Sequence, residues 1–258
     1  MDTFIRSEKE GRVALVTLDR PPVNALTLEM VRELGKALED AGRDEEVSVV
    51  VLAGAVGRAF AAGADIREMA RLDRTSGRAL AQAGHEALGR LAGLAQPVLC
   101  AVEGVCLGGG CEIALACDLR VAGEGARLGL PEVSLGTIPG WGGTQRLPRL
   151  VGRSAALRLM LTAEPVEAQE ALRIGLVDRV VPTGQALATT MEMAGRIAGF
   201  GRLAVQAVKR CALEGLQMPL EEGLRLEVET FSRLCDTEDM KEGLKAFLEK
   251  RKAEFKDR

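Results

Sequence analysis

Short apolar runs recur along the first 181 residues and predict buried strands. The runs lie at residues 13–18, 48–53, 97–102, 118–122 and 177–181. Uninterrupted runs rich in β-branched residues are typical of strands that are covered on both faces of a sheet. The sequence therefore predicts the core of an α/β protein.

Helical spacing of apolar residues fills much of the chain between these runs. Pro21 and Pro22 end the first strand, and Thr27 can cap a helix that runs to about Ala41. Further helices are predicted from Asp65 onward and at residues 111–117, 155–161 and 167–174. Residues 126–144 are rich in Gly and Pro and predict an ordered but irregular layer.

Strand patterns are absent from the sequence after residue 185, where two or three helices are expected. Two of them are predicted at residues 220–234 and 237–255. The second carries an apolar stripe formed by Leu244, Phe247, Leu248 and Phe255. We therefore expect an α/β core over residues 1–195 and a helical C-terminal part over residues 196–258.

Composition restricts the possible chemistry. His85 is the only histidine and tyrosine is absent, so a Ser-His-Asp triad would require His85 and a multi-histidine metal site is excluded. We interpret His85 as a structural or surface residue. The acid–base candidates are then mainly carboxylates, Lys and Cys. The net charge of −3 gives no basic field for nucleic acid or an anionic membrane.

Six cysteines indicate the redox environment of the protein. They stand at positions 100, 106, 111, 117, 211 and 235 and form no C-x-x-C pair. Their apolar surroundings are typical of reduced, buried thiols. The charged N-terminal residues contain no apolar signal core, and no apolar stretch is long enough to span a bilayer. We expect a cytoplasmic protein without a membrane segment.

Two glycine-rich segments could bring backbone amides to a ligand. Residues 58–66 allow close approach of a ligand to the backbone, or form a tight turn between strand and helix. Residues 103–113 lead from a strand through Gly108–Gly110 into a helix, whose first N–H groups could bind an anion or a developing oxyanion. Close helix–strand packing explains these glycines equally well. The segment lacks the G-x-G-x-x-G pattern and a phosphate-loop lysine, which argues against a dinucleotide-binding enzyme.

Two carboxylates stand in otherwise apolar segments. Glu112 lies within the predicted helix 111–117, where a buried carboxylate needs a partner or a cavity, unless it only stabilises the helix start. Glu132 and Trp141 lie in a third segment, residues 128–147. Two carboxylates can act as acid and base when burial and proximity separate their pKa values. The alternative is that Glu112 and Glu132 are two unrelated glutamates in a cap or a turn. Two interpretations of Trp141 are open: its side chain lines a pocket, or it fills the core.

Together these segments resemble the enoyl-CoA hydratase/isomerase (crotonase) superfamily. The resemblance extends from Asp19–Ala25 to Phe247–Lys252, with its most specific parts at residues 59–66, 107–112 and 131–140. Both glutamates of the hydratases are matched, by Glu112 and Glu132. The resemblance implies a crotonase-like spiral of ββα units with a helical C-terminal part, assembled as a homotrimer or homohexamer.

The resemblance also implies a reaction, the reversible addition of water to a trans-2-enoyl-CoA to give a 3-hydroxyacyl-CoA. The N–H groups of Ala64 and Gly109 would form an oxyanion hole for the thioester oxygen. Glu112 would act as base toward the water, Glu132 would protonate Cα, and the Gly140 N–H would help to place the water. Fatty-acid β-oxidation, amino-acid breakdown and polyester synthesis all use this reaction.

Binding of the substrate is implied at further positions. Arg58, Ala62, Asp65 and Ile66 match coenzyme A contacts, and Phe247 and Lys250 match a contact that a neighbouring subunit often supplies. Trp141 stands where a small residue is also common and would narrow the acyl pocket, which predicts short or medium chains. Neither a metal nor a redox cofactor is implied, since coenzyme A is part of the substrate.

Two rival functions remain at this point. A Δ3,Δ2-enoyl-CoA isomerase would share the fold, and one carboxylate would move a proton between Cα and Cγ. The presence of both glutamates favours hydration. A non-catalytic scaffold or RNA-binding relative would also share the fold. The acidic charge balance and the lack of a lysine-rich stripe on the helix from about Ala79 weigh against it.

Overall fold

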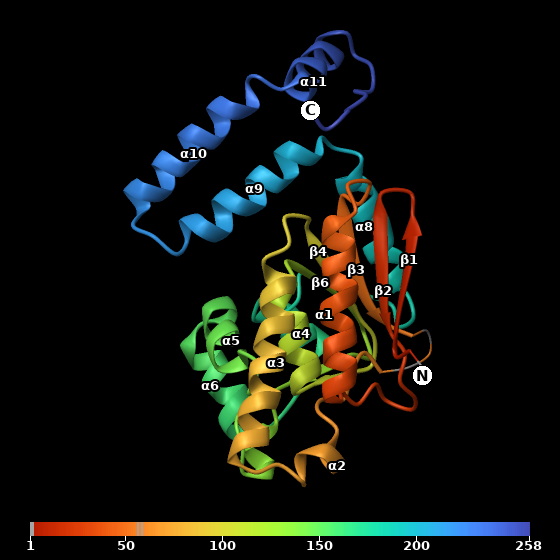
Figure 1. Ribbon diagram of the computed structural model, residues 1–258, viewed down its shortest axis with the longest axis vertical. Helices are drawn as coiled ribbons and strands as arrows, with labels where there is room; N and C mark the ends of the chain where they lie inside the picture. Colours follow the sequence, from red (N-terminus) through yellow and green to blue (C-terminus); the bar gives the residue numbers. More distant parts are fainter. Residues whose placement is uncertain (1–2, 56, 58) are drawn as a thin grey trace.

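The computed structural model describes residues 3–55, 57 and 59–258 (Figure 1). Within them, a six-stranded sheet has the order β1-β2-β3-β4-β6-β9. The strands are β1 (Ile5–Glu10), β2 (Val13–Leu18), β3 (Val49–Gly54), β4 (Val98–Val102), β6 (Leu119–Gly123) and β9 (Arg179–Val181). β1 is antiparallel to β2 and every other neighbouring pair is parallel.

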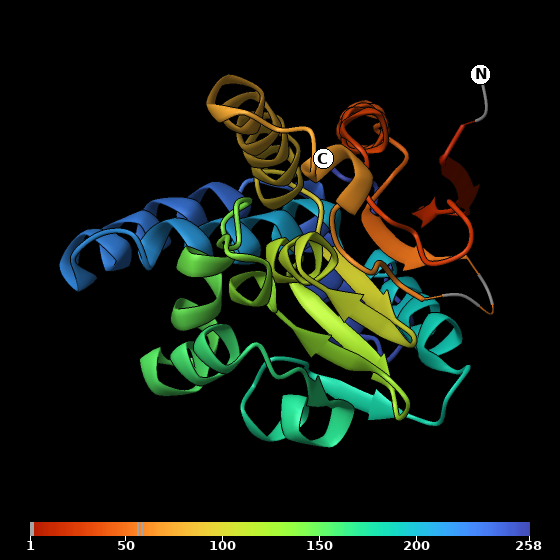
Figure 2. The ribbon, with the colours of Figure 1, turned by 90° about the horizontal axis from the view of Figure 1, so that it is seen from below.

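The five strands predicted from apolar runs are confirmed as β2, β3, β4, β6 and β9. Helices cover both faces of this sheet (Figure 2). On one face, α1 (Leu28–Arg43) and α3 (Arg74–Ala92) pack over alternate side chains of β2, β3 and β4. On the other face, α8 (Ala186–Ala198) contacts β3, β4 and β6. Burial on both faces explains why these strands are apolar at successive positions.

A second, three-stranded sheet has the order β5-β7-β8. It consists of β5 (Val105–Leu107), β7 (Arg127–Gly129) and β8 (Val166–Glu167). β5 runs parallel to β7, with Leu107 opposite Gly129 in the register. β5 leads into α4 (Gly109–Ala116), and β7 leads into the short 3-10 helix η1 (Glu132–Leu135). Because paired parallel strands end at the same edge, α4 and η1 begin side by side.

The remaining helices complete the chain. They are α2 (Ile66–Met69), α5 (Gly143–Val151), α6 (Arg153–Thr162), α7 (Ala168–Arg173), α9 (Arg202–Gly215), α10 (Leu220–Leu234) and α11 (Glu238–Leu248). The predicted cap of α1 is confirmed, since the Thr27 hydroxyl accepts a hydrogen bond from the Met30 N–H at 3.2 Å. None of the helices in the described ranges is long and apolar enough to cross a membrane.

Several expectations about secondary structure were incomplete. The irregular layer of residues 126–144 contains β7 and η1, and α5 begins at Gly143 and continues through Pro148. β1 was not expected because an edge strand with one buried residue and five exposed ones carries no apolar run. Four helices follow residue 185 in the described chain rather than two or three, and α11 ends at Leu248 instead of continuing to residue 255.

The C-terminal helices divide into a part on the sheet and a part beyond it. α8 packs on the sheet, whereas α9 and α10 form a hairpin that projects away from it (Figure 1). The Lys209 ammonium anchors α9 by pairing with Asp118 at 2.6 Å. The expected boundary at residue 195 falls inside α8, and that division stays a prediction.

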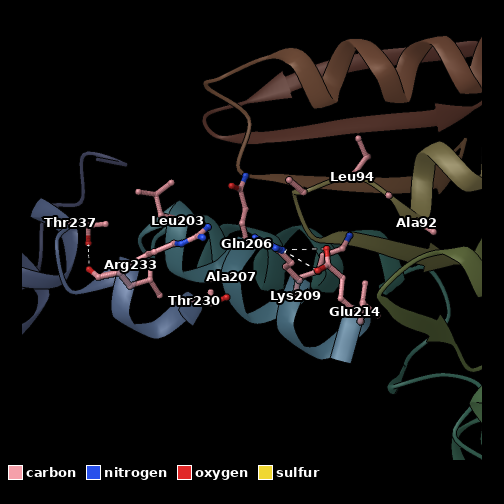
Figure 3. Close-up of a pocket in the computed structure, with 15 residues that line it drawn as sticks. Ala92, Leu94, Leu203, Gln206, Ala207, Lys209, Glu214, Thr230, Arg233 and Thr237 are labelled. Carbon is pink, nitrogen blue, oxygen red and sulfur yellow. Dashed lines mark hydrogen bonds and ion pairs between the residues drawn. The ribbon is translucent and has the colours of Figure 1, made fainter. Parts of the chain in front are cut away.

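A cavity of about 590 Å³ lies where this hairpin meets the turn after α3 (Figure 3). Leu94 lines it from the turn after α3, Leu203 and Gln206 from α9, and Arg233 from α10. Within one chain, apolar side chains of α9 and α10 such as Val208 and Val228 are exposed.

Candidate active site

A second cavity, of about 560 Å³, is bounded by α2, α3, α4 and the segment that leads into α5. Most of the residues predicted for the site line it: Ala62, Ala64, Ile66, Gly109, Glu112, Glu132, Gly140 and Trp141. Among the described residues that line it, the ionisable side chains are Glu112, Glu132 and His85. The structure therefore gathers the sequence motifs, which lie far apart along the chain, around one space.

The pairing of β5 with β7 explains why the two glutamates meet. Gly108 follows β5, and its N–H donates to the Gly129 carbonyl at the end of β7. Glu112 follows in the first turn of α4, and Glu132 is the first residue of η1. Gly108 has φ +52°, and a Cβ at this position would lie 3.1 Å from the Glu132 Oε1. Glycine therefore suits the left-handed turn, and a larger residue here would also crowd the Glu132 carboxylate.

Glu112 is 2% exposed, and its carboxylate is held by backbone donors. Its Oε1 accepts hydrogen bonds from the N–H groups of Trp141 and Gly143, each at 2.7 Å. Burial raises the pKa of Glu112 above its usual range, while these two donors and the charge of Arg146 oppose that rise. The side chain thus does more than stabilise the start of α4, because it connects α4 to the beginning of α5.

Glu132 is half-buried and less well satisfied. Its Oε2 is buried and has no hydrogen-bond partner among the residues that the structure describes. Burial and the negative charge of Glu112 raise the pKa of Glu132 to about 7. A carboxyl group with this pKa is present in both protonation states near neutral pH, which suits proton donation.

Ala64 and Gly109, whose amides are the predicted oxyanion hole, both line this cavity. Leu26 donates to the Gly63 carbonyl at 2.8 Å and accepts from the Asp65 N–H at 2.9 Å, so the Ala64 N–H faces away from Leu26. The neighbouring Gly63 lies beside the start of α4, since a Cβ on it would be 3.8 Å from the Gly109 nitrogen. Gly109 is the first helical residue of α4, so its N–H has no partner inside the helix. Within the described residues, neither amide donates to a protein acceptor.

Trp141 both lines the cavity and fills part of the core. It is 4% exposed, and its indole Nε1 donates to the Leu80 carbonyl at 3.3 Å. The ring packs against Gly84 of α3, where a Cβ would lie 2.0 Å from the indole Cδ1. A Cβ on Gly109 would lie 2.5 Å from the same ring. The two interpretations of Trp141 from the sequence are therefore compatible.

The positions expected to contact coenzyme A differ in their placement. Ala62 and Ile66 line the cavity, and Ile66 is 56% exposed. Asp65 caps α2 by accepting from the Arg67 N–H at 2.9 Å, and its carboxylate pairs with Arg20 at 3.0 Å. Those contacts occupy the Asp65 side chain. Arg58 lies outside the described residues.

Phe247 and Lys250 lie at the other end of the molecule. Phe247 belongs to α11 and is 81% exposed, and Lys250 follows this helix. α11 and α2 occupy opposite ends of the view in Figure 1. Within one chain, these two residues do not line the cavity that contains Glu112.

Sequence reasoning missed two residues at this site. His85 is exposed, as expected for a surface histidine, but it also lines the cavity. Arg146 donates from Nη1 to the Trp141 carbonyl at 2.9 Å, next to the donors that hold Glu112. The sequence carries no signal for this role of Arg146, because its partner is a backbone carbonyl.

The cysteines and possible metal ligands contribute no further site. Cys100, Cys106, Cys111 and Cys117 are buried free thiols, and burial raises the pKa of Cys100 and Cys106. The expectation of burial does not hold for Cys235, which is exposed. In the described part of the chain, no cluster of three or more His, Cys, Asp or Glu could hold a metal ion.

Comparisons with known proteins show the family to which the chain belongs. Residues 8–258 match the family described as enoyl-CoA hydratase/isomerase. The chain is 45% identical over 253 residues to the short-chain-enoyl-CoA hydratase of Clostridium acetobutylicum, with 97% of each chain covered. It is 42% identical over 249 residues to the crotonyl-CoA hydratase of Syntrophomonas wolfei, with 96% of each covered. The structure of an enoyl-CoA hydratase from Bacillus anthracis has a TM-score of 0.96 and 38% identity, and the match covers 99% of this chain and 100% of that one.

Proposed function

The chain belongs to the enoyl-CoA hydratase/isomerase family, as its sequence motifs indicated, and we propose that it is an enoyl-CoA hydratase. The crotonase-like α/β fold expected from the resemblance is confirmed. One observation carries the choice of hydration: Glu112 and Glu132 face one cavity beside the Ala64 and Gly109 amides. Isomerisation needs one carboxylate, which moves a proton between Cα and Cγ. Hydration uses two, because one group takes a proton from the water while the other gives a proton to Cα.

The two amides stabilise the charge that develops during the reaction. The Ala64 and Gly109 N–H groups donate to the thioester oxygen of a trans-2-enoyl-CoA. Polarisation of this carbonyl draws electron density from Cβ and stabilises the enolate that forms when water adds. Losing one donor of this kind typically raises the barrier by about 3 kcal/mol. Gly109 supplies its amide at the N-terminus of α4, where the helix dipole adds favourable potential.

The glutamates divide the proton transfers. Glu112, held by two backbone donors, takes a proton from the water while the water oxygen bonds to Cβ. Glu132, with its pKa raised to about 7, delivers a proton to Cα. The Gly140 N–H lies in the lining of the same cavity and helps to place the water. Because both carboxyl groups contact one water, they titrate as a coupled pair.

The acyl group is short or of medium length in this proposal. The Trp141 ring occupies space beside Gly84 and Gly109 that an extended acyl chain would otherwise use. Two relatives with more than 40% identity are named as short-chain and crotonyl-CoA hydratases, which supports the same preference. Coenzyme A contacts Ala62 and Ile66, and the catalytic groups need no further cofactor or metal.

Assembly as a homotrimer or a pair of trimers is a further part of the proposal. The α9–α10 hairpin exposes apolar side chains, among them Leu216, Leu220, Val228 and Phe231. Phe247 and Lys250 would reach the coenzyme A of a neighbouring subunit, since they are distant from the cavity of their own chain. We place the enzyme in the cytoplasm, where buried free thiols such as Cys100 and Cys106 stay reduced.

Hydration of crotonyl-CoA tests the function directly. The purified protein is mixed with crotonyl-CoA, the conjugated enoyl-thioester absorbance is followed, and chiral chromatography identifies the product. We expect rapid formation of 3-hydroxybutyryl-CoA. Glu132→Gln should lower this rate by several orders of magnitude while coenzyme A binding persists. Turnover of 3-enoyl-CoA alone, or a near-normal rate for Glu132→Gln, would contradict the proposal.

A further inference from the structure

The turn before α5 is held by a side chain that does not reach the reacting atoms. The N–H groups of Trp141 and Gly143 hold Glu112, and the residue between them is Gly142, with φ +109°. Arg146, one helical turn later, donates from Nη1 to the Trp141 carbonyl at 2.9 Å. The same guanidinium lies over Gly142, since a Cβ there would be 2.2 Å from Nη1. Arg146 therefore packs directly on the turn that presents both donors.

Electrostatics connects the same two residues. Arg146 is half-buried, and its burial lowers the pKa of the guanidinium while the charge of Glu112 opposes that change. In return, the positive charge of Arg146 lowers the pKa of Glu112. Within the part of the chain that the structure describes, the other ionisable groups that share the cavity with Glu112 are Glu132 on η1 and His85 on α3. Glu132 is anionic when ionised, so it favours the protonated form of Glu112.

We propose that Arg146 is a positioning residue for Glu112, an inference that rests on the proposed hydratase function. By fixing the Trp141–Gly143 turn, the guanidinium aims two N–H groups at one carboxylate oxygen and leaves the second oxygen of Glu112 for the water. Its charge also favours the ionised form of Glu112, which is the form that accepts a proton during hydration. Arg146 contacts neither the substrate nor the water.

Arg149 provides a matched control on the same helix. It is exposed, and its Nη1 donates to the Gln145 carbonyl at 2.9 Å and to the Gln145 side chain at 3.1 Å. Arg149→Gln removes the same charge and the same type of side chain from α5 as Arg146→Gln. It leaves the contact with the Trp141 carbonyl in place. A general effect of charge or of helix stability should therefore appear in both variants.

The test compares kcat, KM and the pH profile of crotonyl-CoA hydration for these variants. We expect Arg146→Gln to lower kcat by about 10- to 100-fold, as for a misplaced catalytic group, with little change in KM. The acid limb of its kcat profile should move to higher pH, because the pKa of Glu112 rises when the nearby positive charge is lost. Arg149→Gln should retain both the rate and the profile.

Arg146→Lys separates charge from geometry and covers the case in which Arg146→Gln does not fold. Lysine keeps the positive charge but lacks the planar fork, so the acid limb should stay near its normal pH while kcat remains reduced. A normal kcat for Arg146→Lys, or a folded Arg146→Gln whose acid limb does not move, would overturn the inference. A wild-type protein that does not hydrate crotonyl-CoA would instead refute the proposed function.

Discussion

Replacing Glu132 by glutamine should stabilise the protein at alkaline pH. Burial and the charge of Glu112 raise the pKa of Glu132 from 4.5 to about 7 in the folded state. The folded protein thus binds this proton more tightly than the unfolded chain does. The resulting contribution to stability is fully present below pH 4.5 and is lost as the pH rises through 7. Glutamine stays neutral throughout and avoids that loss.

The size of the effect follows from the pKa difference. A rise from 4.5 to about 7 corresponds to about 3 kcal/mol between the two limits of pH. Most of it is lost between pH 5 and pH 8, so Glu132→Gln should gain about 2.5 kcal/mol relative to wild type over this interval. For a chain of this length, that is a relative change in Tm of roughly 5–10 °C.

Thermal unfolding at pH 5 and pH 8 measures this gain. Protein concentration must be the same throughout, because assembly shifts the apparent Tm. Glu164→Gln is the matched control, since Glu164 is exposed and its neutralisation should change Tm little at either pH. A Glu132→Gln variant whose Tm difference from wild type is the same at both pH values would refute the argument that burial makes the ionised form of Glu132 costly.

Three further changes test other parts of the site and the assembly. The first is made in a Trp141→Ala background, which removes the clash that a Cβ on residue 109 would make with the indole. In this background Gly109→Pro should abolish hydration because proline lacks the N–H, whereas Gly109→Ala should retain measurable kcat. Trp141→Ala alone should increase the ratio of long-chain to crotonyl-CoA turnover and lower the unfolding free energy by about 3 kcal/mol, as measured in urea. Truncation before Thr237 should reduce oligomer mass in light scattering or raise KM, and an unchanged mass and KM would show that α11 is dispensable.

Patterns in the sequence were sufficient for the buried strands but not for two other elements. β3 and β4 are covered on both faces, so their apolar runs carry the signal directly. β1 pairs only with β2 and is exposed along most of its length, so backbone pairing rather than apolar burial makes it a strand. α5 starts from two glycines and contains Pro148, which removes the local propensity that would have predicted a helix.

The candidate site shows a similar division. Glu112 and Glu132 could be recognised as unusual because each is a lone carboxylate in an apolar segment. Their approach depends on the parallel pairing of β5 with β7, three-residue strands too short to be read from a hydrophobic pattern. Arg146 could not be assigned from its sequence position, because its contact is with a backbone carbonyl whose orientation is set by the Gly142 turn.

The position of Trp141 makes the cavity optically distinct. It is the only tryptophan in a chain without tyrosine, so a single indole dominates the ultraviolet emission. This indole adjoins Gly109, and the backbone N–H of the same residue donates to the Glu112 carboxylate. Because Trp141 lines the cavity, ligand entry should change the polarity around the ring, and we expect emission from the unlabelled wild-type protein to report occupancy of the cavity. Rapid mixing with a non-reactive acyl-CoA would resolve binding in time, separately from the bond-forming steps that follow it.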